Sequence, residues 1–280
     1  MRTQIEEIIK RAIAEDLGDG DHSSLSCIPI EAMGKAQLKV KEKGVLAGVE
    51  LAKWVFNLID PKLKVEVFIS DGAHVKPGDI AFYVSGPTRS ILAAERTALN
   101  FMQRMSGIAT STDAMVTAMN SAKCKLLDTR KTTPGIRIIE KWAVRIGGGL
   151  NHRMGLFDMI MLKDNHIDFA GGIEKAITRT HEYLKTTNKT LKIEVEVRTL
   201  EDVEEVLRVR GVDRIMLDNF TPQLMKEAVD LIQGKFETEA SGMINLSNIK
   251  EYASTGVDFI SSGSLTHQIK SLDLSLKSVI

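Results

Sequence analysis

The sequence is poor in cysteine, in aromatic residues and in long apolar runs. Its 280 residues include two cysteines, Cys27 and Cys124, and 5% aromatic side chains. Two cysteines are too few for a disulfide framework or for a metal site built on several sulfur ligands, so we expect both thiols to be buried and inert. The scarcity of cysteine is typical of a reducing compartment, and we therefore predict a cytoplasmic protein.

Long apolar segments and an excess of one charge are also missing. No apolar run approaches the roughly 20 residues needed to span a bilayer, and the first residues, MRTQIEEIIKRAIAEDLGDGD, are charged and lack the apolar core of a signal peptide. The 37 Lys and Arg balance 37 Asp and Glu. A general nucleic-acid binder is disfavoured unless basic residues cluster locally. We expect neither a membrane nor a nucleic acid as partner.

The first 110 or so residues indicate a small sheet-rich unit. An opening helix is followed by β-like stretches at 35–50 and 65–86, with a helix at 51–59 between them. A long helical pattern over 90–120 then predicts a connector between two domains. The apolar fraction of 43% is enough for a substantial core.

Beyond the connector, six predicted strands alternate with amphipathic helices. The strands are 125–128, 159–163, 191–197, 213–218, 236–240 and 258–261, and the helices include 172–184, 200–209, 222–232 and 246–254. This alternation indicates parallel strands joined by helical crossovers. Because no unit opens with a GxGxxG turn, a β/α barrel fits better than a dinucleotide-binding sheet.

Polar side chains follow the predicted strands at the ends where a β/α barrel assembles its active site. The first part of this rim, residues 128–166, holds seven basic and four acidic residues. Several of the cations lie in loops or at strand ends, where they can converge: Arg130, Lys131, Arg153 and Lys163. Arginine offers a planar fork for carboxylate or phosphate, so this pattern predicts a small ligand with more than one negative charge. Arg137, Lys141 and Arg145 fit a solvated helix face better than a ligand set.

The second part of the rim carries acidic residues first and small residues after them. Glu194 and Glu196 are two apart on a strand and face the same side, and with Asp218 they suit sugar hydroxyls or a divalent cation. Ser241-Gly242 and Ser262-Gly263-Ser264 suit a phosphate. Two alternatives stay open, because Glu194 also fits an internal salt bridge with a rim lysine, and Asp164 fits a helix cap or an orienter of Lys163. The whole rim predicts a sugar phosphate beside an anionic co-substrate.

These residues lie in a string of motifs that resembles the quinolinate phosphoribosyltransferase family, also called nicotinate-nucleotide pyrophosphorylase (carboxylating). In family order the motifs are ERTALNFMQRMSGIAT (95–110), DTRKTTPG (128–135), GGGLNHR (147–153), MLKDNHI (161–167), EVEV (194–197), MLDNF (216–220), EASG (239–242) and TGVDFISSGSLTH (255–267). They cover most of the chain, which makes the match more specific than any single motif. Nicotinate phosphoribosyltransferase shares the architecture but not this string.

The resemblance implies a two-domain α/β subunit that works as a dimer or an assembly of dimers. Residues 1–110, with the connector helix, would form an open-faced α/β sandwich on which the tail 266–280 packs back, and residues 111–265 would form an irregular β/α barrel. Arg96 would reach into the neighbouring subunit's site. The residues implied for quinolinate are Arg96, Arg130, Lys131, His152, Arg153 and Lys163. Those implied for phosphoribosyl pyrophosphate are Thr129, Glu196, Asp218, Ser241, Gly242, Met243, Ser262, Gly263 and Ser264.

The implied reaction moves a phosphoribosyl group from phosphoribosyl pyrophosphate to quinolinate and releases pyrophosphate and CO2, giving nicotinate mononucleotide for de novo NAD synthesis. The implied catalytic groups are Lys131, Lys163, Glu196 and Asp218. Mg²⁺ would be carried on the pyrophosphate near Glu196 and Asp218, and would not be held by protein alone. The alternatives are a phosphoribosyltransferase for a monocarboxylate such as nicotinate, and a non-catalytic sugar-phosphate-binding barrel.

One position departs from the family pattern. Where the family usually has Ser-Gly-Gly, this chain has Ser241-Gly242-Met243. Met243 can supply its backbone N–H to a phosphate provided that its φ is negative.

Overall fold

The computed structural model describes residues 2–279, which form two compact units. Unit 1 contains residues up to 113 together with 132–148 and the residues from 265 onward, and unit 2 contains 114–131 and 149–264. The division falls within the 32-residue helix α4 (Thr88–Met119), close to the expected bounds of 90–120. No helix among residues 2–279 is both long and apolar enough to cross a membrane.

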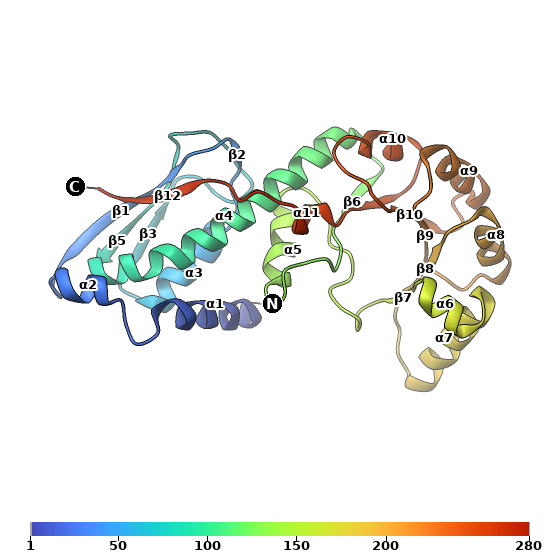
Figure 1. Cartoon of the computed structure of the whole chain (residues 1–280), viewed down its shortest axis with the longest axis horizontal. Helices are drawn as coiled ribbons and strands as arrows, with labels where there is room; N and C mark the ends of the chain where they lie inside the picture. Colours follow the sequence, from blue (N-terminus) through green and yellow to red (C-terminus); the bar gives the residue numbers. More distant parts are fainter. Residues whose placement is uncertain (1, 280) are drawn as a thin grey trace. The chain divides into compact units, whose positions relative to one another are not determined.

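Unit 1 is built on a four-stranded antiparallel sheet in the order β12-β1-β5-β3. Its strands are β1 (Met33–Val40), β3 (Lys64–Val67), β5 (Ile80–Pro87) and β12 (Leu274–Ser278). Ala36, Leu38 and Val40 are buried while their neighbours on β1 are not, so one face of the sheet is packed. The ring of Phe56, on α3 (Val49–Ile59), meets the Phe82 ring of β5 edge to face at 5.9 Å. Helices therefore lie against one face of this sheet (Figure 1).

The remaining elements of unit 1 complete its packing. They are α1 (Arg2–Leu17), α2 (His22–Cys27), the short pair β2 (Gly44–Val45) and β4 (His74–Val75), and α5 (Arg137–Ile146). The C-terminal segment runs along α4, where the Leu272 N–H donates to the Gln103 carbonyl at 3.0 Å. β12 then pairs antiparallel with β1 and forms the edge of the sheet.

Unit 2 is a six-stranded parallel sheet in the order β6-β11-β10-β9-β8-β7. The strands are β6 (Lys125–Leu127), β7 (Ile160–Leu162), β8 (Ile193–Val197), β9 (Arg214–Asp218), β10 (Glu237–Ser241) and β11 (Phe259–Ser261). All six predicted strands are confirmed, with ends that differ by no more than two residues. Their mutual pairing is parallel throughout, as the alternation with helices predicted.

The crossover helices of unit 2 begin at recognisable caps. α8 (Leu200–Val209) and α9 (Pro222–Ile232) match their predicted bounds, because Thr199 and Thr221 accept hydrogen bonds from the first turn of each helix. α7 (Ile173–Thr187) is also confirmed. α10 (Ile249–Ser254) starts later than expected, since the Asn245 side chain accepts from the Ser247 N–H and forms a turn there. Two short helices were not predicted, α6 (Asp164–Ala170) and α11 (Ser264–His267).

The sheet of unit 2 ends at β6 on one side and β7 on the other, although these two strands are neighbours in sequence. In a closed barrel they would pair with each other. The connection between them carries α5, which belongs to unit 1. The six strands described here thus form an irregular barrel that is open between β6 and β7, next to the loops that carry the basic residues.

Helix α5 corrects one expectation about charge. Arg145 is exposed, as expected of a solvated face, but Lys141 is fully buried, so the prediction was wrong for this residue. Its neighbour Glu140 is also fully buried and pairs with Arg104 at 2.7 Å. This face of α5 packs inside unit 1, which the charge pattern alone did not reveal.

The two thiols differ, which corrects the expectation that both are buried. Cys124 is buried, and burial raises its pKa to about 12. Cys27 is exposed at the end of α2. We therefore expect a thiol reagent at pH 8 to modify one cysteine quickly in the native protein and both in denaturant. Cys27→Ser should remove the fast reaction, whereas a fast reaction that survives this change would contradict the structure.

Candidate active site

The carboxylate of Asp128, directly after β6, holds a second loop of the site by hydrogen bonds. It is fully buried and accepts the backbone N–H of His152 at 2.8 Å and the Asn151 side-chain amide at 2.7 Å. A backbone bridge between Leu127 and Leu150 runs beside these bonds. The loop that carries His152 and Arg153 is therefore fixed to β6 by a buried anion.

Two of the predicted cations are near each other in unit 2. Arg153 is buried, and its guanidinium donates to the Met159 carbonyl at 3.2 Å. Burial and then the positive charge of Arg130 hold the pKa of Arg153 below its usual range. Arg130 and Lys131 are exposed, and the Thr129 hydroxyl accepts the Lys131 N–H at 3.0 Å. Several cations on these loops favour an anionic ligand.

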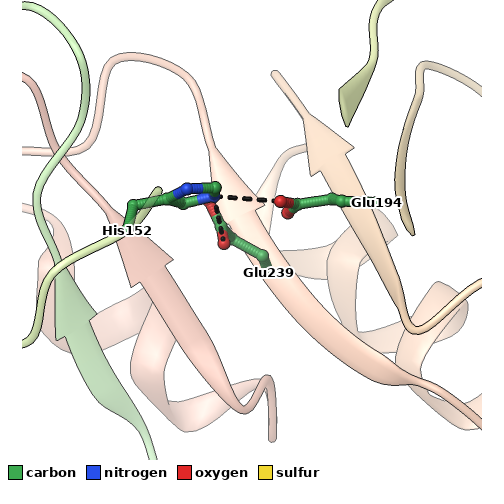
Figure 2. A group of neighbouring side chains, drawn as sticks. All are labelled: His152, Glu194 and Glu239. Carbon is green, nitrogen blue, oxygen red and sulfur yellow. Dashed lines mark ion pairs between the residues drawn. The ribbon is translucent and has the colours of Figure 1, made fainter. Parts of the chain in front are cut away.

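His152 makes contact with two buried carboxylates (Figure 2). Its Nε2 lies 2.9 Å from Glu194 Oε2, on β8, and 3.4 Å from Glu239 Oε2, on β10. Glu239 is also 2.9 Å from the Arg214 guanidinium at the start of β9. Glu194 is thus an internal ion-pair partner, as one alternative held, but its partner is His152 and not a rim lysine.

The charges of this group influence one another strongly. Burial opposes a charged His152 ring, but the two carboxylates outweigh it and raise the pKa of His152 to about 9. Burial, and then the charge of Glu239, raises the pKa of Glu194 to about 7. Burial also acts to raise the pKa of Glu239, yet His152 and Arg214 hold it below its usual range.

The second ring nitrogen of His152 shows where the proton lies. Its Nδ1 accepts the backbone N–H of Arg153 at 2.7 Å. This bond disfavours a proton on Nδ1 and so opposes the doubly protonated ring that a raised pKa would favour. Because the Nδ1 lone pair accepts this bond, the ring proton is assigned to Nε2, which faces the carboxylates.

His152, Glu194 and Glu239 could also be considered as a metal site, because one possible ligand atom from each lies within 4.8 Å of the others. Two features disfavour a cation there. The assigned proton on Nε2 blocks its lone pair, and the Arg214 guanidinium already neutralises Glu239 from 2.9 Å. The group therefore holds a proton and a guanidinium better than it holds a metal ion.

The end of β7 places Lys163 beside Glu196. The Lys163 ammonium lies 3.3 Å from Glu196 Oε2, and Glu196 is buried while Lys163 is exposed. Asp164 pairs with Arg198 at 2.7 Å and also accepts the Asn165 N–H at 2.6 Å in the first turn of α6, which agrees with the helix-cap alternative. Glu196 therefore reaches the rim from the interior of the sheet, two residues beyond Glu194, as the alternation predicted.

Asp218 is the carboxylate at the end of the next strand. Strands β8 and β9 run parallel with Val197 beside Leu217, which brings Glu196 and Asp218 to the same end of the sheet. Asp218 is half-buried, and its Oδ2 accepts from the Asn219 side chain at 2.7 Å. Two carboxylates on adjacent strand ends offer the oxygen ligands that Mg²⁺ prefers.

The loop after β10 differs from its expected geometry. A Cβ at Gly242, where φ is +99°, would lie 2.2 Å from Asn219 Oδ1, so only glycine fits. Met243 has a φ of +48°, and the negative φ on which its phosphate contact was conditional is not found. Its carbonyl accepts from the side chains of Asn245 and Asn248, both at 3.3 Å, and these bonds support the left-handed backbone.

The loop after β11 is tied to its neighbours through Ser262. Its hydroxyl donates to the Ile244 carbonyl at 2.8 Å and lies 2.8 Å from the Ser264 hydroxyl. Its N–H donates to the Leu127 carbonyl at 3.1 Å. The loops after β10, β11 and β6 thus meet on one side of the unit 2 rim.

Unit 2 contains every predicted site residue except Arg96, which is exposed on α4 in unit 1. Three functional candidates were missed: the buried Glu239 and Arg214, and the anchoring role of Asp128. The signal for the first two was present in the sequence, because a charged residue within a buried strand needs a partner. The spacing could not identify that partner.

The chain matches two family models that together cover almost all of it. They are the quinolinate phosphoribosyl transferase N-terminal domain, over residues 21–106, and the C-terminal domain, over residues 108–277. A chloroplastic nicotinate-nucleotide pyrophosphorylase [carboxylating] of Arabidopsis thaliana is 50% identical in an alignment of 288 positions that covers 98% of this chain and 82% of that protein. A probable enzyme of the same name from Bacillus subtilis is 39% identical and covers 98% of this chain and 93% of its own length.

Solved structures agree with this fold. NadC from Streptococcus pyogenes superimposes with a TM-score of 0.94 at 41% identity, over 100% of this chain and 99% of that one. Human nicotinic acid phosphoribosyltransferase gives a TM-score of 0.64 at 12% identity, over 92% of this chain and 72% of that one, and shares the fold alone.

The rim chemistry, the parallel sheet and these relatives agree, and the resemblance read from the motifs is confirmed. The chain belongs to the quinolinate phosphoribosyltransferase family, and it transfers a phosphoribosyl group to quinolinate with decarboxylation in de novo NAD biosynthesis.

Proposed function

We propose that the basic side of the unit 2 rim is the quinolinate pocket, lined by Arg130, Lys131, Arg153 and Lys163, with His152 behind Arg153. The observation that carries this assignment is the buried Arg153 guanidinium, which the Met159 carbonyl holds at 3.2 Å on a loop fixed by Asp128. A dicarboxylate bound in this pocket would make charge-assisted hydrogen bonds with the cations that line it. Arginine forks would also fix the plane of the pyridine ring.

Phosphoribosyl pyrophosphate occupies the other side of the rim in this proposal. Glu196 and Asp218 accept hydrogen bonds from the ribose hydroxyls, and the loops after β10 and β11 bind the 5′-phosphate. The residues assigned to it are Thr129, Glu196, Asp218, Ser241, Gly242, Ser262, Gly263 and Ser264, whereas Met243 is left out because its φ is positive. The meeting of the last two strand loops with the end of β6 supports a single phosphate subsite.

Magnesium fits this proposal as a partner of the pyrophosphate. Glu196 and Asp218 supply carboxylate oxygens at adjacent strand ends, but two such ligands do not make a closed cage, so most of the ion's ligands come from phosphate and water. When bound there, Mg²⁺ neutralises charge on the leaving pyrophosphate.

The chain's own residues then act mainly by position and charge. Loss of pyrophosphate leaves an oxocarbenium-like anomeric carbon, and the basic pocket holds the quinolinate nitrogen opposite it. The nitrogen lone pair forms the new C–N bond as the C–O bond to pyrophosphate breaks. Lys163 lies 3.3 Å from Glu196, between the two substrate sides, where its charge can assist the leaving group.

Decarboxylation follows from the charge created in the first step. Alkylation turns the ring into a pyridinium, whose positive charge stabilises the carbanion left on the adjacent ring carbon when the carboxylate departs as CO2, and this carbon then takes up a proton. Lys131 and Lys163 are the two cations proposed to stabilise the developing carbanion.

Arg96 extends the proposal to a homodimer. It lies on α4 in unit 1, whereas the other assigned residues belong to unit 2, and it is exposed. We assign it to the pocket of a partner subunit, where it would add a third guanidinium to quinolinate. We also propose a cytoplasmic location, which the free and exposed thiol of Cys27 supports.

The two arginines of the pocket can be tested with single substitutions. Arg130→Ala and Arg153→Ala should each lower kcat/KM for quinolinate about 100-fold, because each removes charge-assisted bonds worth roughly 3 kcal/mol in total. Steady-state kinetics against both substrates measure the effect. Arg208→Ala is a matched control, since Arg208 is exposed and pairs with Glu174 on neighbouring helices. Normal quinolinate kinetics in both pocket variants would contradict the assignment.

Subunit mixing tests the role of Arg96. Arg96→Ala and Lys163→Ala should each be inactive alone. After the two proteins are unfolded together and refolded, about one quarter of the sites should be intact if each site combines two subunits, because half of the dimers are mixed and each mixed dimer has one complete site. Native mass spectrometry confirms subunit exchange. Mixed dimers without recovered activity would exclude a shared site.

Met243 and Gly242 should respond in opposite ways. Met243→Gly should raise the free energy of unfolding by about 0.5–1 kcal/mol, since glycine adopts a positive φ without strain, and should leave the KM for phosphoribosyl pyrophosphate within about twofold. Gly242→Ala should raise that KM more than about tenfold, because its Cβ would collide with Asn219. Denaturation and kinetics distinguish the two, and a weaker substrate affinity in Met243→Gly would contradict the loop geometry.

A further inference from the structure

Below the rim, the interior of unit 2 contains four buried titratable or charged side chains that lie close together, three on neighbouring strands and one on a loop. Arg214 is the first residue of β9, Glu194 lies on β8 two residues before Glu196, and Glu239 lies on β10 two residues before Ser241. His152 reaches them from the loop between α5 and β7 (Figure 2). These residues lie one layer deeper than the groups assigned to substrate.

Burial makes this group costly unless its charges are matched. The side chains of Glu194 and Glu239 are fully buried, and that of His152 is 5% exposed. Glu194 Oε2 lies 2.9 Å from His152 Nε2, and this contact with the protonated ring nitrogen compensates the burial of the carboxylate. Arg214 plays the same part for Glu239.

Both ring nitrogens of His152 meet groups of this chain. Nε2 faces the two carboxylates, and Nδ1 accepts the Arg153 N–H at 2.7 Å. A ring so engaged, and so little exposed, has no free nitrogen to offer a carboxylate of the substrate. Its effect on quinolinate must therefore pass through a neighbour, and that neighbour is Arg153.

We propose that Glu194, Glu239 and His152 are positioning residues for Arg153. The carboxylates keep the ring proton on Nε2, which leaves Nδ1 as the acceptor that fixes the backbone of Arg153. Asp128 holds the same loop through the His152 N–H at 2.8 Å. With its backbone fixed from two sides, the Arg153 guanidinium is held in one place before substrate arrives.

The inference rests on the proposed assignment of Arg153 to quinolinate, and a double-mutant cycle tests the two separately. The variants are His152→Leu, Arg153→Ala and their combination, measured by KM for each substrate. Positioning predicts that His152→Leu raises the quinolinate KM about tenfold, and that the double variant is no worse than Arg153→Ala alone. If the increases in quinolinate KM of the two single variants multiply in the double variant, His152 acts independently of Arg153 and the inference is overturned. A normal quinolinate KM in Arg153→Ala would instead overturn the site assignment.

The carboxylates are tested at their own positions. Glu194→Gln and Glu239→Gln keep an acceptor oxygen and should raise the quinolinate KM about threefold, whereas the leucine variants should raise it about tenfold. The KM for phosphoribosyl pyrophosphate should stay within about twofold, a split that a loss of folded protein would not produce. Circular dichroism checks folding, and the glutamine variants carry the test if the leucine variants do not fold.

A matched control lies on the same strand. Glu237, two residues before Glu239, also pairs with Arg214, at 3.0 Å, but its side chain is 41% exposed. Glu237→Gln should leave both KM values unchanged. Folded leucine variants at 194 and 239 with a normal quinolinate KM would overturn the inference, and so would an equal change in the Glu237→Gln control.

Discussion

The compensation of buried charge inside the parallel sheet is the constraint on which the rest of this site depends. A carboxylate in a dry interior is unstable unless a cation or proton donor meets it. Glu239 meets Arg214, Glu194 meets His152, and Asp128 meets two N–H groups of the following loop. Each of these pairs joins one segment to another, so the charges that must be satisfied also determine where the rim loops lie.

The need to compensate buried charge matters most where the sheet of unit 2 is open, between β6 and β7. The connection between these strands is not held by a strand pair across the gap, and its helix α5 belongs to unit 1. The loops that carry Arg130 and Arg153 are instead fixed by Asp128 and by the interior pairs. A small polyanion can therefore be met by a dense set of cations, although the chain as a whole has no net charge. A net charge of zero argues against binding of long polyanions such as nucleic acids, but it does not argue against binding of small ones.

Much of this could be predicted from sequence, because strand and helix periods are local. The six strands and the polar residue at each strand end follow from alternation, and the family follows from the order of motifs. What failed does not follow from the local period of the sequence. Lys141 is buried because its helix packs inside unit 1, Cys27 is exposed because α2 leaves it uncovered, and Met243 has a positive φ because two later asparagines hold its carbonyl. The partner of Glu194 was missed for the same reason, since ring and carboxylate are 42 positions apart in the chain.

The edge strand β12 has a consequence for synthesis. It consists of residues 274–278 and pairs with β1, which begins at residue 33. Every strand of unit 2 is made between these two partners. During synthesis the barrel strands can therefore pair with one another while the unit 1 sheet still lacks β12, and that sheet exposes the free edge of β1 until β12 has been made. Of the two sheets, the one that is begun first is completed last.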